Sequence, residues 1–241
     1  LRSEIRSSTS SMTSVPKPLK FLRPRYIYIK QFYREGTRMP AELKHEVADV
    51  LSVLAMTMAD EGSRECLAFK LEAWHAGGKD VGAWGHQYVR ALAGEIAQEY
   101  SARITAEVPR DVGELIEVVD KIVPFNMRHN AEVEAVDLLM EVQQLGKLVS
   151  GGVGSTGFID EDNYSRVCLY LLRFADYISD EDDLRELLRV TYEIYSAQKQ
   201  WPDALRVALR TYMQIADVAD KDGESSDDED GETNLGLARV K

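Results

Sequence analysis

Hydrophobic residues recur along this chain with the spacing of amphipathic α-helices. Between residues 47 and 58, apolar side chains fall at i, i+3, i+4, i+7, i+8 and i+11, which places them on one face of a helix. The same offsets recur in residues 167–178 and, with one polar member, in residues 184–195. Weaker versions occupy four further segments, 84–100, 112–127, 133–142 and 204–215. No segment alternates with the period of two that a half-buried strand requires, so the sequence predicts an all-α fold.

The boundaries of these predicted helices contain residues that begin or end helices. Pro16 and Pro18 are expected to end any helix that begins the chain, because proline lacks an N–H group and restricts the residue before it. Pro124 falls inside a periodic segment and is expected to kink or divide it. Asp180 or Asp182 is expected to cap the helix that follows by accepting hydrogen bonds from backbone N–H groups.

Helical hairpins in series are typical of solenoid proteins, in which each pair of helices buries its apolar face against the next. The segment 192–209, YEIYSAQKQWPDALRVAL, resembles the second half of one tetratricopeptide repeat and the start of the next. The chain contains no clean self-similarity at the period of about 34 residues that this repeat has. Because the connections are mostly short, we predict antiparallel helical hairpins stacked as a divergent, tetratricopeptide-like α-solenoid.

Charge is unevenly distributed along the 241 residues. The chain has 29 Lys and Arg against 41 Asp and Glu, for a net charge of −12. Residues 1–30 hold seven bases against one acid, whereas residues 220–232, DKDGESSDDEDGE, hold eight acids against one base. The acidic stretch has no apolar residue to bury, so it is expected to be disordered. We predict a helical region at 1–219, which includes a basic segment at 1–30, and an acidic disordered tail at 220–241.

Composition argues against several classes of protein. Non-specific binding to nucleic acid is not expected of an acidic chain, because that affinity comes from Lys and Arg at the phosphates. No run of about 18 apolar residues occurs, so no membrane span is predicted. Two cysteines are too few for a disulfide framework and suit a reducing compartment. Because the chain begins at Leu1 without a signal-like segment, we expect a fragment of a longer soluble intracellular protein.

One glycine-rich motif suggests nucleotide binding. Gly152, Gly154 and Gly157 satisfy G-x-G-x-x-G within SGGVGSTG. That pattern binds a pyrophosphate where it follows a strand and opens a helix. Here a helix is predicted before it, the acidic residues 160–162 follow it, and no Gly-Lys-Ser or Gly-Lys-Thr is present. We interpret the motif as a flexible loop between helices and predict no cofactor.

The four histidines do not form a metal-binding pattern. His45, His75, His86 and His129 include no H-E-x-x-H, and neither cysteine belongs to a C-x-x-C pair. His129 and Glu132 are three residues apart and could share a helix face, but two ligands do not make a site. We therefore predict no catalytic, cofactor-binding or metal-binding residue.

Apolar segments contain the remaining candidates. Cys66 and Cys168 lie in helical stripes and are interpreted as small buried hydrophobic residues. Trp84, Tyr88 and Leu92 are spaced i, i+4 and i+8, which would form either an aromatic groove for a partner helix or part of the core. We favour the core.

The acidic tail also contains a possible modification site. Ser225 and Ser226 precede a run of acids, the setting that acid-directed kinases prefer. Phosphorylation would add to the negative charge already there rather than create a new structure. It is a hypothesis about the tail alone.

Several stretches, taken together and in order, resemble one family. They are SMTSVPKPLKFLRPRY (11–26), DVLSVLAMTM (49–58), SRECLAFKL (63–71), WGHQYVRALAGEIAQEY (84–100), IVPFNMRHNAEVEAVDLLMEV (122–142), NYSRVCLYL (163–171) and PDALRVAL (202–209). They resemble the family of 26S proteasome non-ATPase regulatory subunit 2. The resemblance covers residues 1–210, and we expect it to stop after Met213.

This resemblance, and not the periodicity, implies a function. Members of the family are scaffold subunits in the base of the proteasome regulatory particle, beside the ATPase ring. They help to present ubiquitinated substrates, and they bind shuttle receptors and a deubiquitinase through a toroid of repeats. The toroid lies C-terminal to the region matched here, so no receptor-binding residue is assigned to this chain. The implied role is non-catalytic, in the cytoplasm and nucleus, with the ATPase ring and other regulatory particle subunits as partners.

Two alternatives remain beside this reading. The first is an independent helical-repeat adaptor that binds a peptide or helix in its groove. The second is a nucleotide-dependent enzyme that uses the glycine-rich loop, which the missing strand and lysine disfavour.

Overall fold

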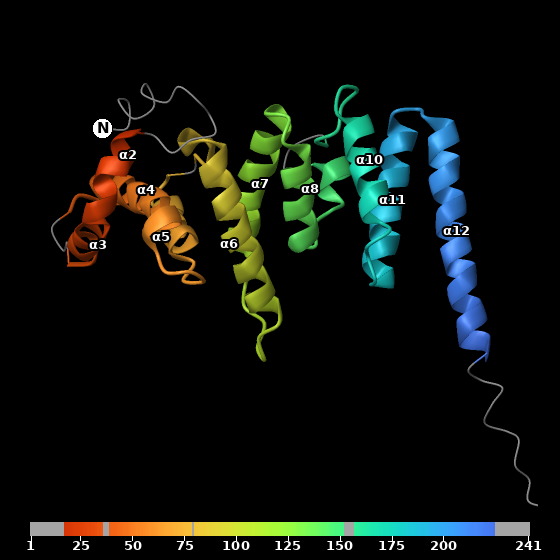
Figure 1. Ribbon diagram of the computed structural model, residues 1–241, viewed down its shortest axis with the longest axis horizontal. Coiled ribbons are helices and arrows are strands. Elements are labelled where there is room, and N and C mark those ends of the chain that lie inside the picture. The colour runs from red at the N-terminus through yellow and green to blue at the C-terminus, as the bar shows by residue number, and fades with distance from the viewer. Residues whose placement is uncertain (1–16, 36–38, 79, 152–156, 225–241) are drawn as a thin grey trace, which may run out of the picture. The chain divides into compact units, whose positions relative to one another are not determined.

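The computed structural model describes residues 17–35, 39–78, 80–151 and 157–224 (Figure 1). These residues contain helices and no strand, so the all-α prediction is confirmed for them. The elements are α2 (Lys17–Leu22), η1 (Arg23–Arg25), α3 (Tyr26–Glu35), α4 (Ala41–Met58), α5 (Glu65–His75), η2 (Gly82–Trp84), α6 (His86–Ile104), α7 (Gly113–Arg128), α8 (Glu132–Glu141), α9 (Lys147–Ser150), α10 (Tyr164–Phe174), α11 (Glu181–Ala197) and α12 (Trp201–Glu224). None of the described helices is long and apolar enough to cross a bilayer.

The chain folds as two compact units, residues 1–170 and 171–241. In the first unit each helix from α3 to α8 packs against the next one along the chain, and α6 also contacts α8 (Figure 1). Fully buried side chains from the five helices α4 to α8 form its core, among them Leu51, Leu67, Leu92, Ile122 and Val136. Serial packing of this kind is the arrangement that stacked hairpins in a solenoid produce.

A pair of tyrosine–glutamate contacts fixes α3 against α5. The hydroxyl of Tyr26 donates to Glu65, and seven residues later the hydroxyl of Tyr33 donates to Glu72 at 2.6 Å. Because both pairs are 39 residues apart in sequence, α3 and α5 run in the same direction. Burial, followed by the bonded carboxylate, raises the pKa of both tyrosines, so they remain donors across the physiological range.

The second unit contains the hairpin of α11 and α12. The carboxylate of Asp180 accepts hydrogen bonds from the backbone N–H groups of Asp182 and Asp183, both at 3.0 Å, and so caps α11. The predicted cap at Asp180 is confirmed, and the alternative at Asp182 is wrong. Ala204 and Val207 are buried side chains of α12, and α12 packs against α11.

The two predictions about prolines have different outcomes. Pro18 lies in the first turn of α2, where the missing N–H would have no intrahelical partner. The segment that it was expected to end lies outside the described residues. Pro16 lies outside the described residues. Helix α7 runs without interruption through Pro124, so the proline does not divide it. The buried neighbours Val123 and Phe125 hold this turn against the core.

The last described helix includes the first residues of the acidic segment. Helix α12 continues to Glu224, so residues 220–224 belong to it. Extending an existing helix adds one hydrogen bond for each residue fixed, which is far easier than starting a helix in an acidic segment. Residues 225–241, with Ser225 and Ser226, lie outside the described part of the chain.

Candidate functional site

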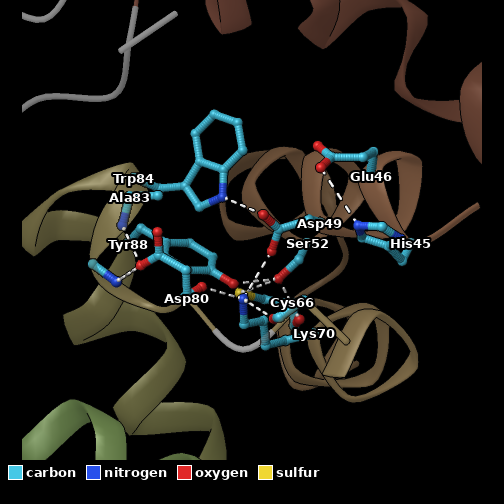
Figure 2. Close-up of polar contacts among 12 residues, drawn as sticks. His45, Glu46, Asp49, Ser52, Cys66, Lys70, Asp80, Ala83, Trp84 and Tyr88 are labelled. Atoms are coloured by element: carbon cyan, nitrogen blue, oxygen red, sulfur yellow. Dashed lines mark hydrogen bonds and ion pairs between the residues drawn. The ribbon is translucent and has the colours of Figure 1, made fainter. Parts of the chain in front are cut away.

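A buried ion pair joins α4 to α5. The ammonium of Lys70 donates to Oδ1 of Asp49 at 2.8 Å, to the carbonyl of Gly78 at 3.2 Å and to the carbonyl of Asp80 at 2.6 Å (Figure 2). An ammonium has three N–H donors, and each has an acceptor here. The ion pair is therefore fully satisfied, as a buried charge requires.

The same network ties down the segment between α5 and α6. The indole N–H of Trp84 donates to Oδ2 of Asp49 at 2.9 Å, so both carboxylate oxygens of that aspartate are bonded. The carboxylate of Asp80 accepts from the backbone of Gly82 at 3.0 Å and of Ala83 at 3.2 Å, which begins η2. A Cβ at Gly82 would lie 2.5 Å from Cε2 of the Phe125 ring, so only glycine fits.

Ser52 joins the remaining buried polar groups. Its hydroxyl donates to the carbonyl of Cys66 at 2.7 Å, which leaves its oxygen to accept from the hydroxyl of Tyr88 at 2.7 Å (Figure 2). Burial raises the pKa of the Cys66 thiol to about 12 and also raises the pKa of Tyr88. Both groups are therefore neutral at physiological pH.

This network has the chemistry of a structural element. Lys70 is 0% exposed and Asp49 1%, and Ser52 and Tyr88 are equally inaccessible, so no substrate can contact them in this conformation. A neutral thiol without an adjacent base is also a poor nucleophile. Among the residues that the structure describes, no group of three or more His, Cys, Asp or Glu could hold a metal ion. The network holds helices in position, so functional contacts are expected at the surface instead.

The structure separates the one histidine–carboxylate pair that the sequence placed together. His129 terminates α7, with Nδ1 at 2.7 Å from the carbonyl of Phe125, whereas Glu132 begins α8 and binds Arg166. The two residues therefore do not share a helix face, because a turn separates them. The His129 ring packs against His86 with centroids 5.1 Å apart, and burial, followed by His129, lowers the pKa of His86.

Each of the other two histidines has one carboxylate neighbour. His45 lies 3.4 Å from Glu46, and His75 lies 3.1 Å from Glu114 and is largely exposed. Neither arrangement supplies the third ligand that a metal site needs.

The aromatic and cysteine interpretations are confirmed. Trp84, Tyr88 and Leu92 are buried, so they belong to the core and form no groove. Trp84 belongs to η2 rather than to the helix that contains the other two. Cys66 and Cys168 are both free and buried.

The glycine-rich motif is only partly described. Gly152 and Gly154 lie outside the described residues. Gly157 has a positive φ of 27°, and a Cβ there would lie 2.6 Å from the carbonyl oxygen of Val149. The motif follows the short helix α9, and no strand occurs in the described residues before it. Gly157 thus has a local steric role.

Sequence reasoning missed the ion pair, although a signal for it exists. Asp49 lies between Ala48 and Val50, and Lys70 lies between two apolar residues, each charge within an apolar helical segment. A charged residue at such a position is almost never fully buried unless it is paired. Two such charges of opposite sign, in two apolar segments close in sequence, were the available indication.

Comparison with known proteins identifies relatives for nearly the whole chain. The family described as the RPN1 N-terminal domain matches residues 1–229. The 26S proteasome non-ATPase regulatory subunit 2 homolog A of Arabidopsis thaliana is 48% identical over 209 residues, which are 87% of this chain and 22% of that protein. The 26S proteasome non-ATPase regulatory subunit 2 of Dictyostelium discoideum is 49% identical over 210 residues, with the same two shares. The 26S proteasome regulatory subunit rpn1 of Schizosaccharomyces pombe is 41% identical over 210 residues, again 87% of this chain and 22% of that protein.

The relatives compared above match 209 or 210 residues, a length that agrees with the expected end of the resemblance near Met213. The family match continues to residue 229. The start of the acidic segment is therefore part of the matched region. The chain spans about 22% of the length of these relatives. On the family match, the chain belongs to the RPN1 N-terminal domain family.

Proposed function

We propose that this chain is the N-terminal helical part of a non-catalytic scaffold subunit in the base of the 26S proteasome regulatory particle. In that role it supports ubiquitin-dependent protein degradation through contacts with other proteins. The observation that carries the proposal is the family match over residues 1–229, together with relatives that are named proteasome regulatory subunits.

Exposed apolar faces support a role in protein contacts. In the first unit, Phe21 is 82% exposed, and Ile27, Tyr28 and Phe32 are each more than 60% exposed. In the second unit, α12 presents an apolar stripe whose members are all more than half exposed: Trp201, Leu205, Leu209, Tyr212 and Met213. Large exposed apolar patches mark interaction sites in soluble proteins.

We expect the partners to be the proteasomal ATPase ring and other regulatory particle subunits, in the cytoplasm and nucleus. Ubiquitin and shuttle receptors are expected to bind the toroid of the complete protein, so no residue of this chain is assigned to them. The net charge of −12 does not favour nucleic acid as a partner.

Affinity purification of the tagged complete protein tests the proposal. The wild-type protein is expected to co-purify with proteasomal ATPases, identified by mass spectrometry. The variant W201Q/L205Q/L209Q is expected to reduce this recovery, because three exposed apolar contacts are lost while the buried face of α12 is unchanged. R206Q on the same helix is the matched control and should have no effect. Consistent absence of proteasomal subunits from the wild-type sample would refute the proposal.

A further inference from the structure

A long groove runs between α6 and α8 in the first unit. It has a volume of about 1100 Å³ and follows nearly the whole length of α6, from His86 to Thr105. Sites for drug-sized ligands have volumes of about 300–1,000 Å³, so this groove exceeds their range. Its length along the helix fits a polypeptide segment better than a small molecule.

Part of the wall formed by α6 has small side chains. Ala93, Gly94, Ala97 and Ala102 line it. A Cβ at Gly94 would meet no atom within 4 Å, so the helix backbone is open to the groove at that point. Small residues allow another helix to approach closely, as they do in tightly packed helix pairs.

The wall formed by α8 is acidic. Glu134, Asp137 and Glu141 line it, and Arg90 on the opposite wall is the one Lys or Arg among the described lining residues. Asp137 accepts a hydrogen bond from Tyr170, whereas the carboxylates of Glu134 and Glu141 form no ion pair with a described residue. Burial raises the pKa of Asp137, and the nearby Glu134 adds to this effect. The groove therefore has unmet negative charge that favours a basic ligand.

Asn126, at the end of α7, also lines the groove and is only 3% exposed. Its amide can both donate and accept hydrogen bonds, so it adds a polar group at this end of the groove.

We propose that this groove binds a basic α-helix of a partner protein. The small face of that helix packs against α6, and its Lys or Arg side chains pair with Glu134 and Glu141. These two carboxylates are seven residues apart, about 10.5 Å along α8, which matches bases seven residues apart on a helix docked alongside. The amide of Asn126 bonds one of the free backbone groups at the end of the docked helix.

The proposal does not depend on the role in the proteasome, because it rests on the groove alone. A titration of the complete protein against a dye-labelled, alanine-rich helical peptide of about 20 residues tests it, with two lysines seven residues apart and fluorescence anisotropy as the readout. The wild-type protein is expected to bind this peptide. The variant E134Q/E141Q should bind it about fivefold more weakly, because two partly exposed ion pairs are lost.

Two further variants separate the groove from general electrostatics and from misfolding. G94L fills the groove and should weaken binding about tenfold, while its better helix propensity keeps α6 folded. E61Q/E161Q removes the same two charges at exposed positions outside the groove and should leave binding unchanged. The proposal is overturned if the wild-type protein does not bind the peptide or if E134Q/E141Q binds it as the wild type does. Equal binding of a peptide with glutamates in place of the lysines would overturn it as well.

Discussion

The first unit contains a buried ion pair and the second unit contains ion pairs exposed to solvent, so the same interaction can be compared in two surroundings. Lys70 and Asp49 in the first unit are almost fully buried. The three N–H groups of the Lys70 ammonium and both carboxylate oxygens of Asp49 have hydrogen-bond partners. On α11 in the second unit, Arg189 bonds Glu186 and Glu193 while about half of its side chain is exposed.

The difference teaches that burial, and not the number of bonds, determines what an ion pair contributes. Water solvates the exposed charges nearly as well as their partners do, so little stability depends on them. The buried charges have lost that water, so each depends entirely on the groups around it. The buried pair consequently specifies one geometry for the segment between α5 and α6, which the exposed pairs cannot do.

The largest effect is expected from K70M. This change removes the ammonium partner of the buried Asp49 carboxylate, so we expect the free energy of unfolding to fall by about 3–5 kcal/mol. Urea denaturation followed by tryptophan fluorescence measures it well, because Trp84 is itself in the network.

A double variant sharpens this prediction. D49L/K70M removes both charges and should cost less than K70M alone, because no unpaired charge remains in the core. If K70M shifted the urea midpoint no more than an exposed arginine substitution does, the structural role assigned to the buried pair would be wrong.

Substitution of Glu95 is expected to have an intermediate effect on the free energy of unfolding. The Glu95 side chain is half-buried, and its carboxylate accepts a hydrogen bond from the backbone. Arg64, which precedes α5, has a φ of 52° and supplies no side-chain cap. Instead Glu95 reaches across from α6 and accepts from the backbone N–H of Leu67 at 2.8 Å. E95A should lower the free energy of unfolding by about 1–2 kcal/mol, as loss of a helix cap does. Faster hydrogen exchange at the Leu67 amide would confirm the cause.

The same residue gives a pH dependence of defined sign. Burial raises the pKa of Glu95, and hydrogen bonds from the backbone of Leu67 and Cys66 only partly oppose this. The folded state thus binds the Glu95 proton more tightly than the unfolded state, in which the pKa of a glutamate is about 4.3. The stability that this proton contributes is therefore lost as the pH rises from about 4.3 through the pKa of the folded state. E95Q lacks this loss, so its stability relative to wild type should increase from pH 4 to pH 7. An unchanged difference between E95Q and wild type would contradict the assignment.

The sequence predicted those parts of the molecule that depend on local periodicity. Helices α4, α6, α7, α8, α10, α11 and α12 follow from apolar stripes, because burying one face is what stabilises such a helix. The tyrosine-rich α3 was missed, because its buried residues Tyr26 and Tyr33 are held by glutamates 39 residues away. The ion pair and the groove were missed for the same reason: each arises only when distant segments pack.

The smallest effect is expected from R189M on α11. Its partners Glu186 and Glu193 lie three and four residues away on the same exposed face, a geometry that contributes about 0.3–0.5 kcal/mol in helices. The urea midpoint of R189M should therefore differ little from wild type. Added salt should shrink even this difference, because ions screen exposed charges over about 10 Å at 0.1 M ionic strength. K70M should keep nearly its whole effect in the same salt, since ions do not reach the buried pair. If salt reduced the effects of R189M and K70M equally, the buried and the exposed ion pairs would not differ in how solvent ions screen them.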